Sequence, residues 1–242
     1  MKLIGLIGGM SWQSSAEYYR LINELVGQKL GGHHSARLLL YSVDFDPIEK
    51  AQHEGRWDRL ADMLGEAACA LQKAGADFLV LCTNTMHKVA DTVSQISSLP
   101  LVHIVDATAE AIQQAGLRRI GLLGTRFTME DGFYSARLQE RFGIETLIPP
   151  ERDRADVHRV IYDELCHGQV RQESRELYQA VISRLVAGGA EGVVLGCTEI
   201  PLLIGPQDTE VPVVDTTRVH AEAVVTLALG SESGRPQGSS GG

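Results

Sequence analysis

The chain lacks a long hydrophobic run: none of its apolar stretches approaches the roughly 20 residues that a helix needs to cross a bilayer. Its apolar N-terminus, Met1–Gly9, is too short and too rich in glycine for a signal peptide. Positive charge is also scarce, since 22 lysines and arginines against 31 acidic residues give a net charge of −9. A nucleic-acid-binding protein would need a basic stripe. We therefore expect a cytoplasmic protein with no membrane and no nucleic-acid partner.

Metal-binding motifs are missing as well. The four cysteines form neither a CxxC pair nor a zinc-like spacing, and no histidine pair has the HExxH pattern. His33 and His34 are neighbours in a segment that follows two glycines, and their spacing forms no metal-binding motif. We therefore expect reduced thiols, as in the cytoplasm, and no metal site.

The chain does contain an internal repeat, a feature that changes how the whole fold is interpreted. The segment Gly75–Asn84 aligns with Gly189–Thr198 without a gap, at an offset of 189 − 75 = 114 residues. In this register Thr83, not Cys82, corresponds to Cys197. The repeat recurs at offsets of 116 and 112, in Gly5–Gly8 with Gly121–Gly124 and Leu99–Val102 with Val211–Val214. Such a chain can form two similar lobes that each direct one reactive group at a shared cleft.

Short apolar runs alternate with amphipathic stretches, which is typical of βαβ units around a parallel sheet. The predicted strands are Leu3–Ile7, Arg37–Ser42, Phe78–Leu81, Leu101–Ile104, Arg119–Leu123, Gly192–Leu195 and Val213–Val214. The predicted helices are Ser14–Lys29, Arg56–Lys73, Thr85–Ile96, Ala107–Ala115, Met129–Phe142, Asp153–Leu165, Ser174–Ala187 and Val219–Leu229. The predicted fold class is α/β, with two similar lobes, each a mainly parallel sheet flanked by helices, and the active site in the cleft between them.

The 242 residues suffice for two lobes. We expect the first lobe to span residues 1–105 and the second 106–215, with 216–230 packing back onto the first. The Ser- and Gly-rich tail, 231–242, cannot bury apolar surface and is predicted to be disordered. Glycines are expected to end helices at Gly31, Gly75, Gly116, Gly143 and Gly188.

Cys197 is the first candidate for chemistry. It follows the apolar run Gly192–Leu195 and precedes Pro201, a residue that suits the first turn of a helix. We therefore expect Cys197 between the carboxyl end of a parallel strand and a helix N-terminus. Ligands bind at that edge of an α/β sheet, and a helix N-terminus lowers the pKa of a thiol. The alternative is a buried structural cysteine.

Thr83-Asn84-Thr85 occupies the matching turn of the first lobe, where helix capping is the alternative to a functional role. The turn Gly8–Ser11 could present backbone N–H groups to a carboxylate or phosphate, and the hydroxyls of Gly124–Thr128 could bind the same ligand. A dinucleotide site is disfavoured because the GxGxxG spacing is absent. Asp44–Asp46 and the charged stretch Glu49–Arg59 are interpreted as solvated surface, except for Gln52.

In combination, four motifs give the chain a family resemblance along nearly all of residues 1–229. They are Gly8-Gly9-Met10-Ser11-Trp12, Leu81-Cys82-Thr83-Asn84-Thr85-Met86-His87, Leu123-Gly124-Thr125-Arg126-Phe127-Thr128-Met129 and Gly196-Cys197-Thr198-Glu199. On these residues the chain resembles the cofactor-independent aspartate/glutamate racemase family, above all its broad-specificity amino-acid racemases. The resemblance implies an isomerase that acts on a small-molecule amino acid without any cofactor and forms a homodimer.

The resemblance also implies a role for individual residues. Cys197 and Thr83 would be the acid/base pair that flanks the substrate's α-carbon, although relatives typically carry cysteine on both sides. The amino-acid head group would be held by Met10, Ser11, Asn84, Thr85, Thr198 and Glu199. Gln52 would lie near the side-chain pocket, where aspartate-preferring relatives tend to use basic residues, and it therefore argues against strict aspartate specificity.

The implied mechanism is proton transfer on both faces of the α-carbon. Cys197 would take the proton from the L-enantiomer and Thr83 would supply one from the opposite side. A threonine alkoxide is scarcely populated near neutral pH, so we expect slow turnover of the D-enantiomer and a kinetic preference for L to D. Two alternatives remain open: a single-cysteine decarboxylase or cis–trans isomerase of a small carboxylic acid, and a non-catalytic carboxylate-binding protein.

Overall fold

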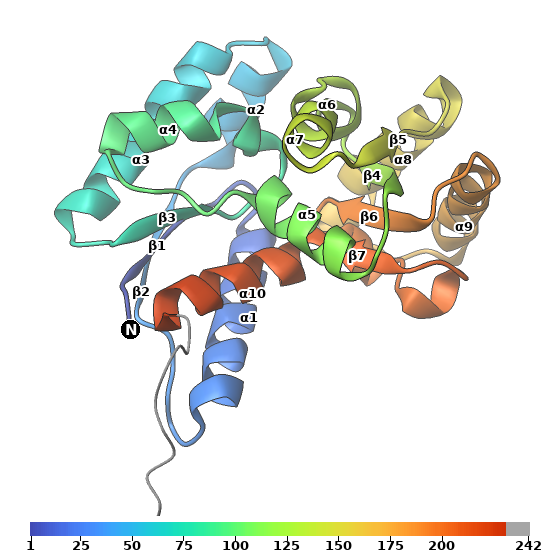
Figure 1. Ribbon diagram of the computed structural model, residues 1–242. Coiled ribbons are helices and arrows are strands. Elements are labelled where there is room, and N and C mark those ends of the chain that lie inside the picture. The colour runs from blue at the N-terminus through green and yellow to red at the C-terminus, as the bar shows by residue number, and fades with distance from the viewer. Residues whose placement is uncertain (231–242) are drawn as a thin grey trace, which may run out of the picture.

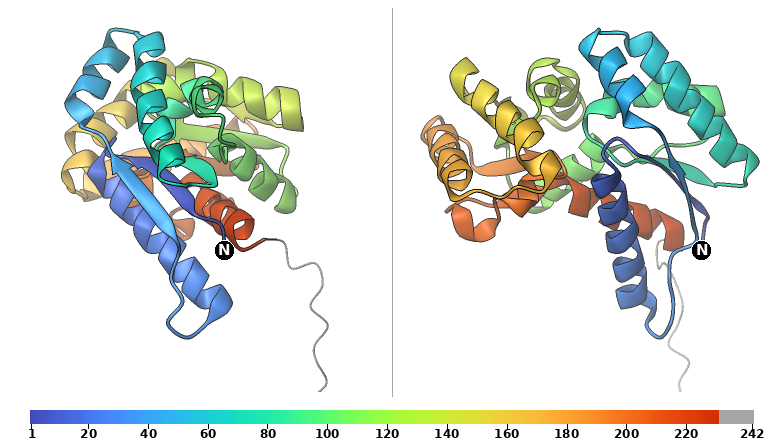
Figure 2. Two further views of the ribbon diagram at one scale, coloured as in Figure 1. Left: turned by 90° about the vertical axis from the view of Figure 1, so that its left-hand side faces the viewer. Right: turned by 180° about the vertical axis from the view of Figure 1, so that it is seen from behind.

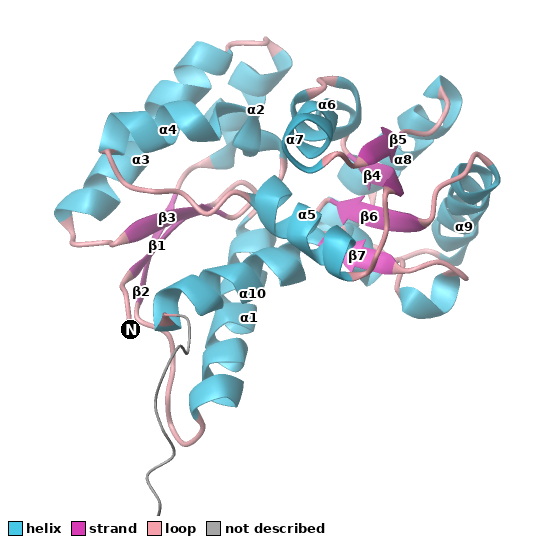
Figure 3. Cartoon of the chain, in the orientation of Figure 1, coloured by secondary structure: helices cyan, strands magenta, loops and turns pink. Residues whose placement is uncertain are grey.

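The computed structural model describes residues 1–230 and contains two parallel sheets (Figures 1 and 3). The predicted disordered tail lies outside the described residues. The first sheet has the strand order β2-β1-β3 and the second the order β5-β4-β6-β7. Their strands are β1 (Ile4–Gly8), β2 (Leu38–Ser42), β3 (Phe78–Leu81), β4 (Arg119–Gly124), β5 (Glu145–Leu147), β6 (Gly192–Gly196) and β7 (Val213–Asp215). The predicted α/β fold class, with two lobes built on parallel sheets, is confirmed.

Helices cover both faces of each sheet (Figure 2). The α-helices are α1 (Trp12–Leu30), α2 (Phe45–His53), α3 (Trp57–Lys73), α4 (Ala90–Ser97), α5 (Ile104–Gln114), α6 (Arg126–Glu130), α7 (Phe133–Phe142), α8 (Glu151–Asp163), α9 (Gln172–Ala187) and α10 (Thr216–Leu229). The short 3-10 helices are η1 (Thr85–Val89), η2 (Leu165–His167), η3 (Ile200–Leu202) and η4 (Pro206–Asp208). No helix within residues 1–230 is long and apolar enough to cross a membrane.

The central strands are apolar along their whole length because both of their faces are buried. In the first sheet, Leu79 and Leu81 pack beneath α2, α3 and α4, whereas Val80 and Cys82 pack against α1 and α10. In the second sheet, Leu195 packs against α8 and α9, and the opposite face packs against α5 and α7. Helix α10 lies against α1 and α5 (Figure 1). The C-terminal helix thus completes the core beneath the first sheet.

The sequence repeat coincides with the strand register. Ile7 pairs with Leu81 between β1 and β3, and Leu123 pairs with Leu195 between β4 and β6. Both pairs follow the offsets, since 123 − 7 = 116 and 195 − 81 = 114. The turns that follow β3 and β6 are therefore structurally equivalent.

Several predicted elements need correction. The predicted strand Leu101–Ile104 is wrong: Leu101 forms only an isolated bridge to Leu79, and α5 already begins at Ile104. His103 ends the extended segment because its side chain accepts a hydrogen bond from the Val105 N–H and caps α5. Strand β5 was not predicted.

Three predicted helices are divided. Thr85–Ile96 is a 3-10 turn followed by α4, and Asp153–Leu165 covers most of α8 and the first residue of η2. The helix predicted over Met129–Phe142 is interrupted at Gly132, whose φ of +74° separates α6 from α7. Helix α2 was not predicted, since its residues were interpreted as solvated surface.

Three histidines that lie far apart in the sequence meet in the core between α10, α5 and the turn after β3. The ring centroids of His87 and His103 are 4.7 Å apart, and those of His87 and His220 are 5.5 Å apart. All three act as neutral rings. His220 accepts a hydrogen bond from the Tyr18 hydroxyl and donates one to the Val102 carbonyl. His103 also accepts at Nδ1, and His87 donates from Nδ1 to the Thr83 carbonyl at 2.8 Å.

Burial lowers the pKa of all three histidines, to about 3 for His103 and about 4 for His220. Below about pH 6.5 these histidines therefore bind more protons in the unfolded chain than in the folded chain. We predict that the free energy of unfolding falls as the pH drops below this value, by up to ~1.4 kcal/mol per pH unit for each histidine. Urea unfolding measured across this pH range tests the slope.

His220→Gln should make this slope shallower, with His33→Gln, the same change in an exposed stretch, as the control. An unchanged slope in His220→Gln would contradict the prediction.

Candidate active site between the two sheets

A cavity of about 440 Å³ lies between the two lobes. One end is formed by the turns after β1, β3, β4 and β6, so the carboxyl ends of both sheets face the same space. The rest of the lining comes mainly from α2 of the first lobe and from α8 and η2 of the second. All nine predicted site residues line this cavity: Met10, Ser11, Gln52, Thr83, Asn84, Thr85, Cys197, Thr198 and Glu199.

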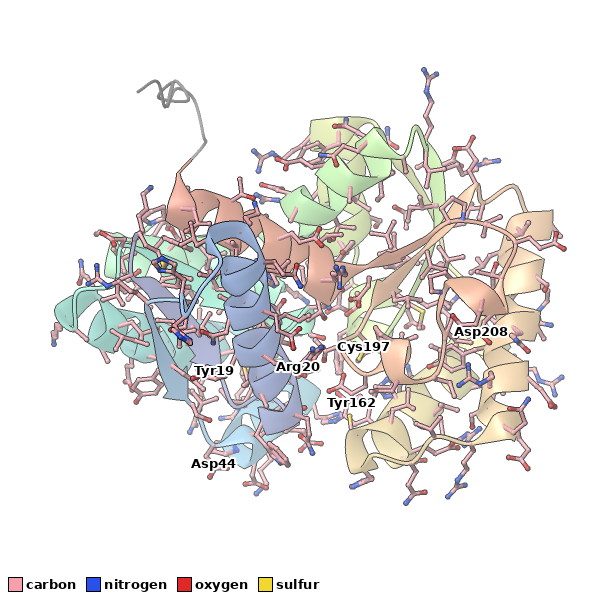
Figure 4. All side chains as sticks on the ribbon, turned by 90° about the horizontal axis from the view of Figure 1, so that it is seen from below. Tyr19, Arg20, Asp44, Tyr162, Cys197 and Asp208 are labelled. Carbon is pink, nitrogen blue, oxygen red and sulfur yellow. The ribbon has the colours of Figure 1, made fainter. Side chains whose placement is uncertain are left out.

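The two predicted acid/base residues come from equivalent turns. Thr83 follows β3 and Cys197 follows β6, and both line the cavity. Figure 4 shows Cys197 on the side of the second lobe that faces the first. Cys82 lies instead in the core between the first sheet and α1, fully buried and outside the cavity lining.

The glycines of these turns make room for the cavity wall. Gly9 has a φ of +94°, and a Cβ at this position would collide with the Val43 backbone. A Cβ on Gly196 would approach the Leu123 carbonyl to 3.0 Å and the Thr128 side chain to 3.2 Å. A side chain at either position would therefore force the turn or its neighbours to shift.

The Glu199 carboxylate joins the two lobes. Ser11 and Ser14 of the first lobe each donate a hydroxyl hydrogen bond of 3.0 Å to its Oε1. Its Oε2 accepts hydrogen bonds from the Cys197 thiol at 2.9 Å and from the Thr198 hydroxyl at 2.7 Å. Glu199 is only 7 % exposed, and all four donors are neutral. A carboxylate held in this way lacks the positive partner that a buried charge normally has.

The same contact determines the state of Cys197. Burial raises the pKa of its thiol well above the usual value, and the negative charge of Glu199 raises it further. The expectation that a helix N-terminus would lower this pKa is therefore wrong. The helix that follows is η3, a three-residue 3-10 turn whose dipole is too short to offset a carboxylate in hydrogen-bond contact.

Further hydroxyl and amide contacts cross between the lobes. The Thr85 hydroxyl lies 3.2 Å from that of Thr125 and 3.4 Å from that of Thr128. The Asn84 amide donates to the Thr216 hydroxyl at the start of α10. The carbonyl oxygen of Asn84 is buried without a hydrogen-bond partner, and so is the Nε2 group of Gln52. Both atoms are covered by neighbouring protein atoms, so a ligand in the cavity reaches them only when the Asn84 or Gln52 side chain shifts.

Several lining residues were not predicted. Phe45, Asp46 and Glu49 extend from α2 along the face that also carries Gln52, so the solvated-surface interpretation of this segment is wrong for them. Their spacing of three to four residues was the available signal. The second lobe adds Ile161, Tyr162, Cys166 and His167, and Ser14 supports Glu199 from outside the lining. The positions of these second-lobe residues and of Ser14 depend on tertiary contacts that no local sequence pattern indicates.

Among residues 1–230 no group of three or more His, Cys, Asp and Glu side chains is arranged to hold a metal ion. The described residues that line the cavity include no lysine and no arginine.

The chain is similar to known proteins over almost its whole length. The family model described as Asp/Glu/hydantoin racemase matches residues 7–224. The structure of a putative Asp/Glu racemase from Yersinia pestis is 54% identical, with a TM-score of 0.90, and covers 95% of this chain and 100% of its own. That of an aspartate racemase homologue from Pyrococcus horikoshii OT3 is 35% identical, with a TM-score of 0.84 and the same coverage.

Among curated proteins, the broad-specificity amino-acid racemase RacX of Bacillus subtilis is 22% identical over 96% of this chain and 100% of its own length.

Replacement of Glu199 should change the acidity of the neighbouring thiol. In Glu199→Gln the pKa of Cys197 should fall by about one to three pH units, because the adjacent negative charge is removed while the burial stays. The measurement is the pH dependence of thiolate ultraviolet absorbance, with the signal of the matching Cys197→Ser protein subtracted. Glu173→Gln, an exposed change on α9, is the control. An unchanged thiol pKa in Glu199→Gln would contradict the proposed effect of the Glu199 charge on Cys197.

Proposed function

The chain belongs to the Asp/Glu/hydantoin racemase family and is therefore an isomerase, and we propose that it racemises amino acids without a cofactor by proton transfer between Cys197 and Thr83. The observation that carries this proposal is the buried Glu199 carboxylate with four neutral donors and no cation. An α-ammonium group is the positive partner that this carboxylate needs. It would arrive beside the Cys197 thiol, where the reacting carbon must lie.

The polar turns would bind the rest of the amino-acid head group. Asn84 presents an unpaired buried carbonyl oxygen, and Thr85 and Thr198 present hydroxyls at the same end of the cavity. Met10 and Ser11 form the wall next to Glu199. Donors fixed in advance around the substrate carboxylate would stabilise the negative charge that develops when the α-proton leaves.

Proton transfer would begin at the thiol. The bound ammonium would offset the Glu199 charge that raises the pKa of Cys197, so the thiol would release its proton to solvent while Glu199 stays ionised. The thiolate would then take the α-proton of the L-enantiomer and become a thiol again. The Thr83 hydroxyl would give its proton to the opposite face of the carbanion. Uptake of a proton from solvent by the Thr83 alkoxide would restore the starting state.

Pyridoxal phosphate chemistry has no anchor in this cavity, because such enzymes hold the cofactor through a lysine Schiff base and no described lining residue is a lysine. Two acid/base side chains on opposite faces of the α-carbon suffice for its inversion, so no further catalytic group is required.

The Thr83 hydroxyl should make the two directions unequal in kcat. Because the enantiomers are equally stable, kcat/KM must be the same in both directions, and any bias has to appear in kcat and KM separately. We predict that Thr83→Cys raises kcat from the D-enantiomer, since a thiolate is a far better base than an alkoxide near neutral pH. Chiral chromatography of both reactions tests this.

Cys82→Ala is the matched control, as it changes the neighbouring buried cysteine and should preserve both rates. If Thr83→Cys had no effect and Cys82→Ala abolished activity, the assignment of the two residues would be wrong.

Solvent exchange gives the broader test of the function. The wild-type protein in deuterium oxide should incorporate deuterium at the α-carbon of at least one amino acid. Cys197→Ala should reduce this rate by about 10²- to 10⁴-fold, the usual contribution of a positioned acid/base group. Mass spectrometry over both enantiomers of the common amino acids measures it. Carbon dioxide release from a malonate without α-exchange would instead support the decarboxylase alternative.

A further inference from the structure

The part of the cavity between α2 and α8 is its side-chain end, the part of the proposed site that the side chain of the substrate would occupy. The proximity of the two helices is shown by the ring centroids of His53 and Tyr162, 6.4 Å apart. From the first lobe this end receives Asp46, Glu49 and Gln52.

The charges at this end are negative. Asp46 and Glu49 line the cavity, whereas the described lining residues include no lysine and no arginine. Asp46 is paired with Lys50 at 2.7 Å and Glu49 with His53 at 3.1 Å, but neither partner lines the cavity. His167 is the remaining titratable group with a nitrogen at this end, and it is largely exposed. A substrate carboxylate placed here would meet like charges and no fixed cation.

The neutral groups at this end can still form hydrogen bonds. Gln52 is 3 % exposed, and its Nε2 group has no partner in the structure. Tyr162 is half-buried and presents a phenol from α8, and burial raises the pKa of that phenol so that it stays uncharged. Phe45 and Ile161 supply apolar surface beside them. An unpaired amide donor, a neutral phenol and an apolar wall together suit an uncharged polar group.

We propose that the preferred substrates are amino acids with an uncharged, hydrogen-bonding side chain, and that Gln52 and Glu49 exclude aspartate and glutamate. This inference rests on the proposed racemase function. Gln52 selects for a polar group by offering a buried donor that is costly to leave unpaired. Glu49 selects against an acidic group by placing negative charge beside it.

The test compares side chains of equal size. The α-deuterium exchange rates of L-glutamine and L-glutamate, and of L-asparagine and L-aspartate, should differ by at least about tenfold in kcat/KM in favour of the amide. Glu49→Gln should narrow this ratio by raising the rate of the acid, with little change for the amide. Gln52→Arg, which adds a cation, should narrow it further. Glu54→Gln is the control, since it removes the same charge at the C-terminus of α2 outside the cavity.

The outcomes separate the two proposals. If glutamate and aspartate exchanged as fast as their amides, or if Glu49→Gln changed the ratio no more than Glu54→Gln, the inference about side chains would be wrong while the racemase would stand. If no amino acid exchanged deuterium, the proposed function would be wrong and this inference with it. Because Glu49 is partly exposed, its variant should fold even where the buried Gln52→Arg does not.

Discussion

The buried carboxylate of Glu199 is the contact on which the arrangement of the site depends. It accepts two hydrogen bonds from the first lobe and two from the second, so it holds both lobes against one cavity. A carboxylate removed from water is costly unless a positive charge accompanies it. The described residues supply only neutral donors here, which suits a cationic group of the substrate. The same negative charge raises the pKa of the Cys197 thiol, so the sulfur is held in its protonated form.

The duplicated fold explains how the two proposed proton carriers come to line the same cavity. In each lobe the central strand pairs with the strand that carries the reactive turn, and both sheets direct their carboxyl ends at the cavity. Thr83 and Cys197 are therefore placed by the same construction twice. The buried histidines secure the first-lobe turn from behind, because His87 donates to the Thr83 carbonyl from within the core. The backbone of the hydroxyl-bearing residue is thus held without any contact to its side chain.

The features that could be predicted from the sequence are those set by local residue patterns or by the internal repeat. Six of the seven described strands and the equivalence of the two turns could be predicted, because buried parallel strands leave apolar runs and the repeat aligns the turns without a gap. The roles of the nine predicted site residues came from the family resemblance. Cys82 and Thr83, the first residues after β3, go to different places: Cys82 packs in the core against α1 and α10, whereas Thr83 lines the cavity. The direction of the Cys197 pKa could not be predicted, since it depends on how deeply Glu199 is buried. Helix α2 was missed because its charged residues are exposed or half-buried and resemble an ordinary surface segment.

The two ends of the cavity differ in how strongly the duplication constrains them. Helices α2 and α8 follow the edge strands β2 and β5, which occupy equivalent places in the two sheets, so they too are topological counterparts. The repeat that is detectable in the sequence nevertheless falls on the strands and their turns, not on these helices. Groups that act on the α-carbon must be positioned within a fraction of an ångström by rigid strand ends. Groups that meet the side chain of the substrate need only suitable charge and space, which a helix face provides with many different residues. The proposed substrate preference can therefore change through substitution of Gln52 or Glu49 while the proposed proton-transfer pair stays in place.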